Sequence, residues 1–170
     1  MNIFKKLMNK MQEETIVENV EKDCIYSPIE GEVIPLKEIP DEVFSQGMMG
    51  KGCGIKPSEG KVYAPFDGEI VLIANTKHAI ALKSSDGIEL LIHVGMDTVK
   101  MNGKGFNPIV TVGDRVKCGQ LIMEFYVPYI EEAGYEPTAA IIVTNFQEYA
   151  SVEVLTEGII KKSEKIIKAV

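Results

Sequence analysis

The sequence predicts an all-β fold: an antiparallel β-sandwich or barrel-like domain with a few short helical turns and an amphipathic N-terminal segment. Short β-type runs alternate with Gly and Asp turn dipeptides from Cys24 to about Val154. No apolar run exceeds five residues, whereas a membrane-spanning helix needs about 20. The 170 residues fit one domain with short flanking segments.

The expected elements follow from the alternation of apolar residues between turn signals. The predicted strands are Cys24–Tyr26, Glu32–Leu36, Gly54–Lys56, Lys61–Ala64, Glu69–Ala74, Ala79–Ser84, Ile88–Val94, Leu121–Tyr126 and Ala139–Thr144. Helical signal is confined to stretches near Pro40–Phe44, Pro128–Ala133 and Gln147–Tyr149, and to a C-terminal run from Ser163.

Charge and cysteine usage exclude several classes of protein. The 25 acidic residues outnumber the 18 basic ones and leave a net charge of -7, so nucleic acid is a poor partner and basic proteins are better ones. Cys24, Cys53 and Cys118 are odd in number and form no CxxC pair, which argues against a disulfide framework and a thiolate zinc site. The N-terminus lacks the apolar core and cleavage site of a secretory signal. A cytoplasmic location is expected.

The charge is divided between the N-terminal segment and the rest of the chain. In residues 1–11, Phe4, Leu7, Met8 and Met11 follow helical spacing, and three lysines give a charge of +3. The remaining 15 bases and 25 acids give -10. We expect Met1–Met11 to be disordered when free and to form a helix on anionic lipid, the alternative being a frayed terminus whose lysines aid solubility.

Three segments are therefore expected along the chain. Residues 1–23 comprise the amphipathic segment and an acidic, solvated linker without Gly or Pro. Residues 24–162 form the folded domain, and residues 163–170 are a C-terminal tail.

The only two histidines flank one predicted hairpin, residues 79–94. A two-residue turn, whether at 86–87 or at 85–86, places His78 and His93 on one face, about 4.5–8 Å apart at Cβ. A three-residue loop would break this arrangement.

The shared face of the two histidines suits nucleophilic chemistry. Leu91 makes this face partly apolar, and desolvation keeps an imidazole neutral and therefore nucleophilic near pH 7. A single histidine at a strand end is more often a satisfied surface or core residue. The pair, with Asp97 four residues beyond His93 on a Gly-containing turn, favours a functional site.

Five stretches of the sequence form a specific pattern. They are Ser27-Pro28-Ile29-Glu30-Gly31-Glu32, Ile39-Pro40-Asp41-Glu42-Val43-Phe44, Gly52-Cys53-Gly54-Ile55-Lys56-Pro57, Asn75-Thr76-Lys77-His78-Ala79 and Glu89-Leu90-Leu91-Ile92-His93-Val94-Gly95-Met96-Asp97-Thr98-Val99. The most specific part is the His-x-Gly-x-Asp-Thr-Val run that follows an E-L-L-I strand. Together these stretches resemble the glucose-specific IIA family of the bacterial phosphoenolpyruvate-dependent sugar phosphotransferase system, and the resemblance covers about Ile25 to Lys161.

This resemblance implies a phosphocarrier activity, a phosphotransferase in a phosphohistidine relay. His93 would take phosphate on Nε2 from the histidine phosphocarrier protein and pass it to the cysteine of a IIB domain. His78 would hydrogen-bond the phosphoryl oxygens, Thr76 would orient His78, and the Gly95 carbonyl would hold His93 by Nδ1. No nucleotide or cofactor is required.

The resemblance also implies a docking surface, an apolar depression with an acidic rim. Ala74 departs from the family, in which a bulkier side chain is common near the site. Without the resemblance, Val43 and Phe44 also fit a buried helix face, and the Met pair fits loop packing. The apolar contacts would be Val43, Phe44, Met48 and Met49, and Asp41 and Asp97 would meet arginines of the phosphocarrier protein.

Two other classes of function stay open at this point. A zinc-dependent peptidoglycan hydrolase uses H-x-x-x-D, which residues 93–97 match, but it also needs a later H-x-H that is absent. His78 and His93 could bind adventitious zinc with a further ligand from a partner. A non-catalytic regulator switched by phosphorylation of His93 is the third class. The transported sugar, the permease, any regulatory clients and the oligomeric state are not readable from the sequence.

Overall fold

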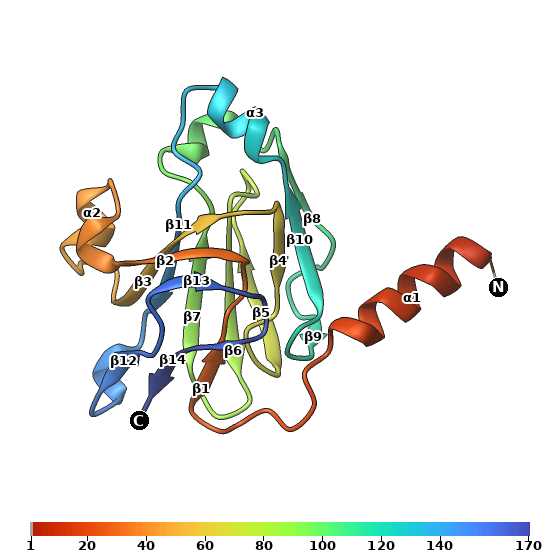
Figure 1. The fold of residues 1–170 in the computed structure, drawn as a ribbon, viewed down its shortest axis with the longest axis horizontal. Helices are drawn as coiled ribbons and strands as arrows, with labels where there is room; N and C mark the ends of the chain where they lie inside the picture. Colours follow the sequence, from red (N-terminus) through yellow and green to blue (C-terminus); the bar gives the residue numbers. More distant parts are fainter. Residues whose placement is uncertain (1) are drawn as a thin grey trace.

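The computed structural model describes residues 2–170 and confirms the all-β fold (Figure 1). Within these residues all strand pairs are antiparallel, and the strands form three sheets. The strands are β1 (Cys24–Tyr26), β2 (Gly31–Pro35), β3 (Lys51–Pro57), β4 (Lys61–Tyr63), β5 (Gly68–Ile73), β6 (Ala79–Ser84), β7 (Glu89–His93), β8 (Phe106–Pro108), β9 (Arg115–Val116), β10 (Leu121–Phe125), β11 (Ala139–Val143), β12 (Val152–Val154), β13 (Gly158–Ile160) and β14 (Lys165–Ala169).

Helical structure in the described residues is short except at the N-terminus. The expected helical turns near residues 40–44, 128–133 and 147–149 are confirmed with small shifts of their ends. The helices are α1 (Ile3–Thr15), α2 (Glu42–Ser45) and α3 (Val127–Glu132), and the 3-10 turns are η1 (Leu36–Glu38), η2 (Thr98–Met101) and η3 (Phe146–Glu148).

One hydrophobic core joins the three sheets. The eight-stranded sheet has the order β13-β2-β3-β11-β7-β6-β5-β9, and the two three-stranded sheets have the orders β4-β10-β8 and β1-β14-β12. Buried side chains from all three sheets meet in this core, among them Ile92 of β7, Ile122 of β10 and Ile167 of β14. Apolar burial of this extent is the main favourable term in folding.

A second, smaller cluster lies on the other face of the largest sheet, beneath α2. It contains Phe44 of α2, Met96, and Ala140 and Ile142 of β11. Strand β11 therefore contributes alternate side chains to both clusters, with Ile141 in the main core. A strand covered on both faces needs a continuous apolar run, which explains the sequence Ala-Ala-Ile-Ile-Val.

All nine predicted strands are confirmed, with ends that differ by at most three residues. Strands β8, β9, β12, β13 and β14 were not predicted. Most of these are two or three residues long, and such short strands carry too little alternation to be recognised in a sequence.

The predicted two-residue turn of the histidine hairpin is wrong. Ala79 pairs with His93 and Lys83 with Glu89, a register that closes a three-residue loop at 85–87. The side chain of Ser84 occupies the loop: its Oγ donates to Asp86 at 2.6 Å and accepts from the backbone N–H of Ile88 at 2.8 Å. Gly87, with φ of 101°, supplies the left-handed residue that such a loop requires.

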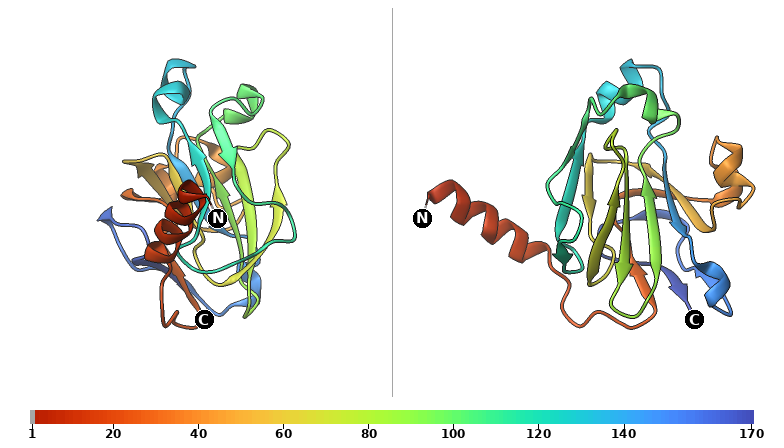
Figure 2. Two further views of the ribbon diagram at one scale, coloured as in Figure 1. Left: turned by 90° about the vertical axis from the view of Figure 1, so that its right-hand side faces the viewer. Right: turned by 180° about the vertical axis from the view of Figure 1, so that it is seen from behind.

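Helix α1 is longer than the expected segment of residues 1–11 and projects away from the sheets (Figures 1 and 2). Asn2 caps its first turn, because its side chain accepts the backbone N–H of Phe4 at 3.0 Å. Ile3, Phe4 and Leu7 are 76%, 69% and 54% exposed. The side chains of Met8 and Met11, predicted on the same stripe, lie outside the described residues, as does Met1.

The expected solvated linker is instead a strap held against the domain. We define the strap as residues 16–23. The backbone N–H of Val17 donates to the carbonyl of Cys118 at 2.8 Å, and Val17 and Val20 pack against buried Cys24 and Cys118. Glu21 forms an ion pair with Lys165 on β14. The acidic composition of this segment predicted a solvated linker, although its two valines pack against the domain.

The expected C-terminal tail of residues 163–170 is also wrong, as is its expected helical run. Strand β14 lies between β1 and β12, and Ile166, Ile167 and Ala169 are fully buried. Its partner β1 lies at residues 24–26, at the other end of the domain's sequence. Pairing over such a distance has no local signal, so two adjacent isoleucines near a terminus did not predict a central strand.

Candidate active site

The structure brings the two histidines together at one end of the largest sheet. His93 is the last residue of β7, and His78 immediately precedes β6. Their ring centroids are 4.7 Å apart, and the rings are nearly perpendicular at 80°. Under strict strand alternation, the three-residue loop would place them on opposite faces. His78 lies just before β6, and its carbonyl continues the β6–β7 register by accepting the N–H of Val94 at 2.8 Å. It follows Lys77, whose φ of 63° turns the chain, so strict alternation does not apply to its side chain.

The turn after β7 determines which nitrogen of His93 carries the proton. His93 Nδ1 lies 2.8 Å from the carbonyl oxygen of Gly95. A carbonyl oxygen only accepts hydrogen bonds, so Nδ1 is the protonated nitrogen and Nε2 has the free electron pair. Gly95 has φ of 77°, and a Cβ there would lie 2.4 Å from the methyl carbon of Thr98. Glycine is therefore required at this position.

The loop that precedes β6 holds the His78 ring in place. Its Nδ1 lies 2.8 Å from the hydroxyl oxygen of Thr76. The side chain is 7% exposed, and its ring centroid is 6.5 Å from that of Phe106 on β8. Burial lowers the pKa of His78, so the ring is neutral near pH 7.

The His93 ring is also neutral, because its pKa is lowered further than that of His78. Burial and the neighbouring His78 ring lower its pKa to about 4, although the Gly95 carbonyl and the Asp41 carboxylate act in the opposite direction. The apolar neighbourhood includes Phe44, whose ring centroid is 4.9 Å from that of His93. A neutral imidazole with a free electron pair on Nε2 is a nucleophile that needs no deprotonation step.

The residues expected to form a docking surface differ in their exposure to solvent. Met48 is 70% exposed, Val43 44% and Met49 40%, whereas Phe44 is only 6% exposed. Phe44 therefore belongs to the buried face of α2 and forms a wall against His93, as its alternative interpretation stated. Val43 lies in α2, and Met48 and Met49 follow it; α2 itself adjoins His93 through Phe44.

The two expected acidic residues also lie near the site. Asp41 caps α2, because its Oδ1 accepts the backbone N–H of Val43 at 2.9 Å. Its carboxylate raises the pKa of His93, which is consistent with its position beside the ring. Asp97 is exposed in the turn after β7, with φ of 58°.

Sequence reasoning missed several residues of this region. Phe106 was missed because β8 was not predicted. Val71 and Leu72 are 43% and 49% exposed on β5, where a bulge breaks the alternation of that strand. Half-buried Leu91, which packs against the α2 cluster, was not missed, because the sequence already placed it on the strand face of His93.

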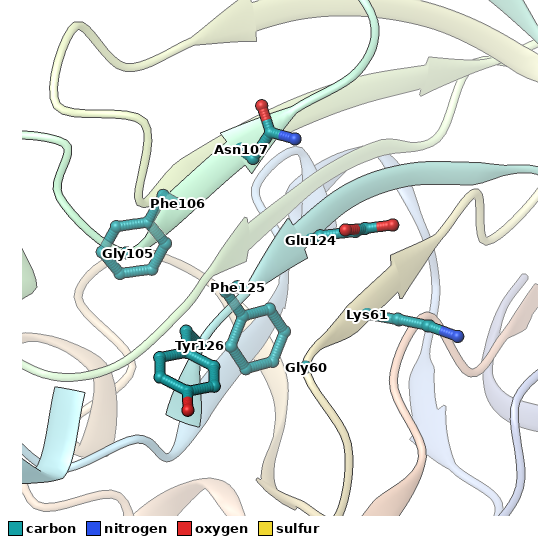
Figure 3. Close-up of a pocket in the computed structure, with 8 residues that line it drawn as sticks. All are labelled: Gly60, Lys61, Gly105, Phe106, Asn107, Glu124, Phe125 and Tyr126. Carbon is teal, nitrogen blue, oxygen red and sulfur yellow. The ribbon is translucent and has the colours of Figure 1, made fainter. Parts of the chain in front are cut away.

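A hollow of about 420 Å³ lies on the β4-β10-β8 sheet rather than at the histidines (Figure 3). Phe106 lines this hollow and also lies against His78, with the two ring centroids 6.5 Å apart. Its polar side chains, Lys61, Asn107 and Glu124, come from cross-strand neighbours on the outer face of that sheet. Neither a histidine nor a cysteine is among the residues that line this hollow.

The part of the chain that the structure describes, residues 2–170, shows neither a cluster of metal ligands nor a membrane-spanning helix. No group of three or more His, Cys, Asp or Glu side chains within this range is placed to hold a metal ion. No helix in the same range combines the length and the apolar character that crossing a membrane requires.

Comparison with protein families decides the classification. The family described as "phosphoenolpyruvate-dependent sugar phosphotransferase system, EIIA 1" matches residues 23–149. The chain belongs to this family. The matched range contains both histidines, the turn after β7 and helix α2. The predicted resemblance to a IIA component of the sugar phosphotransferase system is thus confirmed. The zinc hydrolase alternative has no support.

Relatives occur both as separate proteins and as parts of longer ones. The chain is 42% identical over 163 residues to the glucose-specific EIIA component of Staphylococcus aureus (strain COL), covering 95% of each chain. It is 46% identical over 139 residues to the beta-glucoside-specific EIIBCA component of Dickeya chrysanthemi, covering 82% of this chain. The chain spans only 22% of the length of that longer relative.

A solved structure supports the fold. Glucose permease IIA from Mycoplasma capricolum superposes with a TM-score of 0.76 at 29% sequence identity, covering 85% of this chain and 93% of that one. The β-sandwich class is confirmed.

The depressed pKa of His93 predicts how the ring titrates. With a folded pKa of about 4 instead of 6.5, His93 should stay neutral at pH 5.5. We expect the ring nitrogens of His93, followed by NMR in ¹⁵N-labelled protein, to show no midpoint between pH 8 and 5. A midpoint near the ordinary histidine value would contradict the prediction.

The same shift predicts the direction of a stability change. Between pH 6.5 and 4 the unfolded chain binds a proton that folded His93 does not, so the stabilisation is full above 6.5 and is lost as the pH falls toward 4. The urea midpoint of the native protein should therefore drop more steeply over this range than that of His93→Gln. Parallel curves for the two proteins would show that His93 contributes nothing.

Proposed function

We propose that Nε2 of His93 accepts a phosphoryl group from the histidine phosphocarrier protein and passes it to the cysteine of a IIB domain. The observation that carries this proposal is the 2.8 Å contact between His93 Nδ1 and the Gly95 carbonyl, which leaves the electron pair on Nε2. The second neutral imidazole lies 4.7 Å away, where it can meet the incoming group.

The transfer balances without any cofactor. The electron pair on Nε2 forms the new N–P bond while the donor's N–P bond breaks and returns its electron pair to the donor nitrogen. Attack leaves positive charge on the His93 ring, and the Nδ1–H···O=C bond to Gly95 stabilises it. In the second step the cysteine thiolate takes the phosphoryl group, and the electron pair returns to Nε2. Positioning and charge stabilisation thus do most of the catalytic work.

His78 and Thr76 would stabilise the phosphoryl group rather than accept it. If the Thr76 hydroxyl donates to His78 Nδ1, then His78 Nε2 carries the proton and can donate it to a phosphoryl oxygen. Burial of His78 keeps its ring neutral until the phosphoryl charge arrives. We therefore assign to Thr76 the role of orienting the His78 ring.

The docking surface that we propose combines exposed apolar side chains with acidic ones. Val43, Met48 and Met49 supply adaptable apolar contact, and Asp41 and Asp97 favour a basic partner face. Phe44 contributes as a buried wall rather than a direct contact. Exposed Leu72 and half-buried Leu91 extend the apolar area across the sheet.

The relatives support a IIB domain as the acceptor, because the longer ones carry B and A components in a single chain. Relatives named for glucose and for beta-glucoside are both similar to this chain, so we assign no sugar. We also propose that regulatory proteins bind this chain and that it is located in the cytoplasm. A peripheral contact with a membrane is proposed as well. Zinc, if present, would take His78 and His93 as two ligands and the remainder from a partner molecule.

Substituting the two histidines separately tests the proposed relay. His93→Gln should reduce phosphoryl acceptance to background, because an amide cannot act as the nucleophile. His78→Gln should accept within about tenfold of the native rate but transfer onward on the order of 100-fold more slowly, since an amide donates a hydrogen bond but cannot take up charge. Both steps are followed with phosphoenolpyruvate, the two general phosphotransfer proteins and a IIB domain.

Two outcomes would contradict this scheme. Acid-labile phosphate on the His93→Gln protein would remove His93 as the acceptor. Equal losses in both steps for His78→Gln would make His78 a structural partner of His93.

The acidic rim is tested by removing one charge. Asp97→Asn keeps a residue that tolerates φ near 58° and should raise the concentration of phosphocarrier protein needed for half-maximal rate by about three- to fivefold at low salt. The effect should vanish in high salt, because screening removes charge attraction. Glu153→Gln, an equal charge change on exposed β12, is the control. An unchanged requirement at both salt concentrations would place docking elsewhere.

The proposed membrane contact of α1 is tested with vesicles and with a variant that carries acidic residues on the apolar face of the helix. The native protein should sediment with phosphatidylglycerol vesicles, and the double variant Phe4→Glu, Leu7→Glu should not, since its exposed apolar stripe is lost. Ile159→Glu, at a position 79% exposed on β13, is the matched control and should bind like the native protein. Equal sedimentation of all three proteins, or none at all, would eliminate the membrane contact.

A further inference from the structure

Thr98 is a buried polar residue beside the site that the proposed relay does not yet use. It is fully buried at 0% exposure, begins η2 and lies five residues after His93. Its hydroxyl donates to the carbonyl oxygen of Val94 at 2.6 Å. Its methyl group lies against Gly95, because a Cβ on that glycine would be 2.4 Å from Thr98 Cγ2.

The peptide that Thr98 contacts is the one that directs the Gly95 carbonyl. The Val94 carbonyl belongs to the peptide bond between Val94 and Gly95, so holding its oxygen restricts rotation on both sides of that bond. On the other side of Val94, its N–H donates to the carbonyl of His78 at 2.8 Å. Val94 is thus fixed between His78 and Thr98 through its two backbone polar groups.

Two further features show that this turn needs restraint. Gly95 and Asp97 both have left-handed backbone conformations, with φ of 77° and 58°. A left-handed residue other than glycine is costly and persists where its surroundings hold it. The N–H of Met96 donates to the carbonyl of Glu136 at 2.9 Å, which fixes the far side of the turn. Thr98 supplies the side-chain hydrogen bond within the turn itself.

We propose that Thr98 is a positioning residue for His93. Its hydroxyl holds the Val94–Gly95 peptide so that the Gly95 carbonyl accepts the proton of His93 Nδ1 and leaves the electron pair on Nε2. Thr98 acts only through Gly95 and does not touch the reacting atoms. This inference rests on the proposed role of Nε2 as the phosphoryl acceptor, but the tautomer that it predicts is measurable without any phosphoryl transfer.

The test compares two substitutions that divide the functions of the threonine side chain. Thr98→Val keeps the shape and loses the hydroxyl, and Thr98→Ser keeps the hydroxyl and loses the methyl group. Ser27→Ala is the control, because Ser27 is also buried and its hydroxyl also donates to a backbone carbonyl, that of Ile29 at 2.8 Å. The first readout is the pair of ring-nitrogen chemical shifts of His93 at pH 7 in the full-length, unphosphorylated protein.

The native protein, Thr98→Ser and Ser27→Ala should each show His93 as the Nδ1–H form. Thr98→Val should show a mixture of the two neutral forms. Its phosphoryl acceptance should fall by about five- to tenfold, the effect of one neutral hydrogen bond, while the other two proteins stay within about twofold of the native rate. If Thr98→Val does not fold, Thr98→Ala replaces it with the same expectation.

The outcomes separate this inference from the relay itself. A pure Nδ1–H form and native acceptance in Thr98→Val would overturn the positioning role. A mixture in Thr98→Ser as large as that in Thr98→Val would also overturn it, because the hydroxyl would then be irrelevant. If His93 of the native protein accepts no phosphoryl group, the relay fails, and the ring-nitrogen shifts still decide what Thr98 does.

Discussion

The hydrogen bond between His93 Nδ1 and the Gly95 carbonyl is the contact on which the chemistry of this site depends. It decides which ring nitrogen has the free electron pair, and it stabilises positive charge on the ring. The bond requires the chain to reverse within two residues after β7, and Gly95 makes that reversal with φ of 77°. Any side chain at Gly95 would meet Thr98 and the Glu136 carbonyl, so the surrounding turn is built around the absence of one.

The rest of the sheet keeps His93 both rigid and neutral. Strand β7 lies in the middle of the eight-stranded sheet, between β11 and β6, so its last residue is held by ladders on both sides. The cluster beneath α2 covers the His93 face and brings Phe44 against the ring. These side chains exclude water from the His93 ring, and this desolvation lowers the pKa of the imidazole. The same packing thus stabilises the fold and prepares the nucleophile.

The sequence located the histidine pair for a partly mistaken reason. Asp86-Gly87 is a strong signal for a two-residue turn, but the loop also includes Ser85, and the side chain of Ser84 at the end of β6 holds this three-residue loop through Asp86 and Ile88. The histidines still meet because His78 lies before the ladder, where register does not dictate direction. Strands β1 to β7, β10 and β11 could be predicted because each has local alternation or a continuous apolar run, bounded by turn signals. Strand β14, Thr98's contacts and the wall formed by Phe106 depend on distant pairings or on backbone dihedrals, which a single sequence does not display.

The strap of residues 16–23 gives the position of α1 a consequence for the site. Val17, Val20 and the Glu21–Lys165 ion pair fasten the base of α1 to the turn around Cys118 and to β14. Figures 1 and 2 place α1 and α2 on opposite sides of the sheets, and α2 is the element that adjoins His93. A freely jointed linker would let a surface-bound α1 bring any face of the domain toward that surface. The fastened strap restricts which face of the domain can turn toward that surface. A surface that binds α1 therefore leaves the α2 side of the domain open to protein partners.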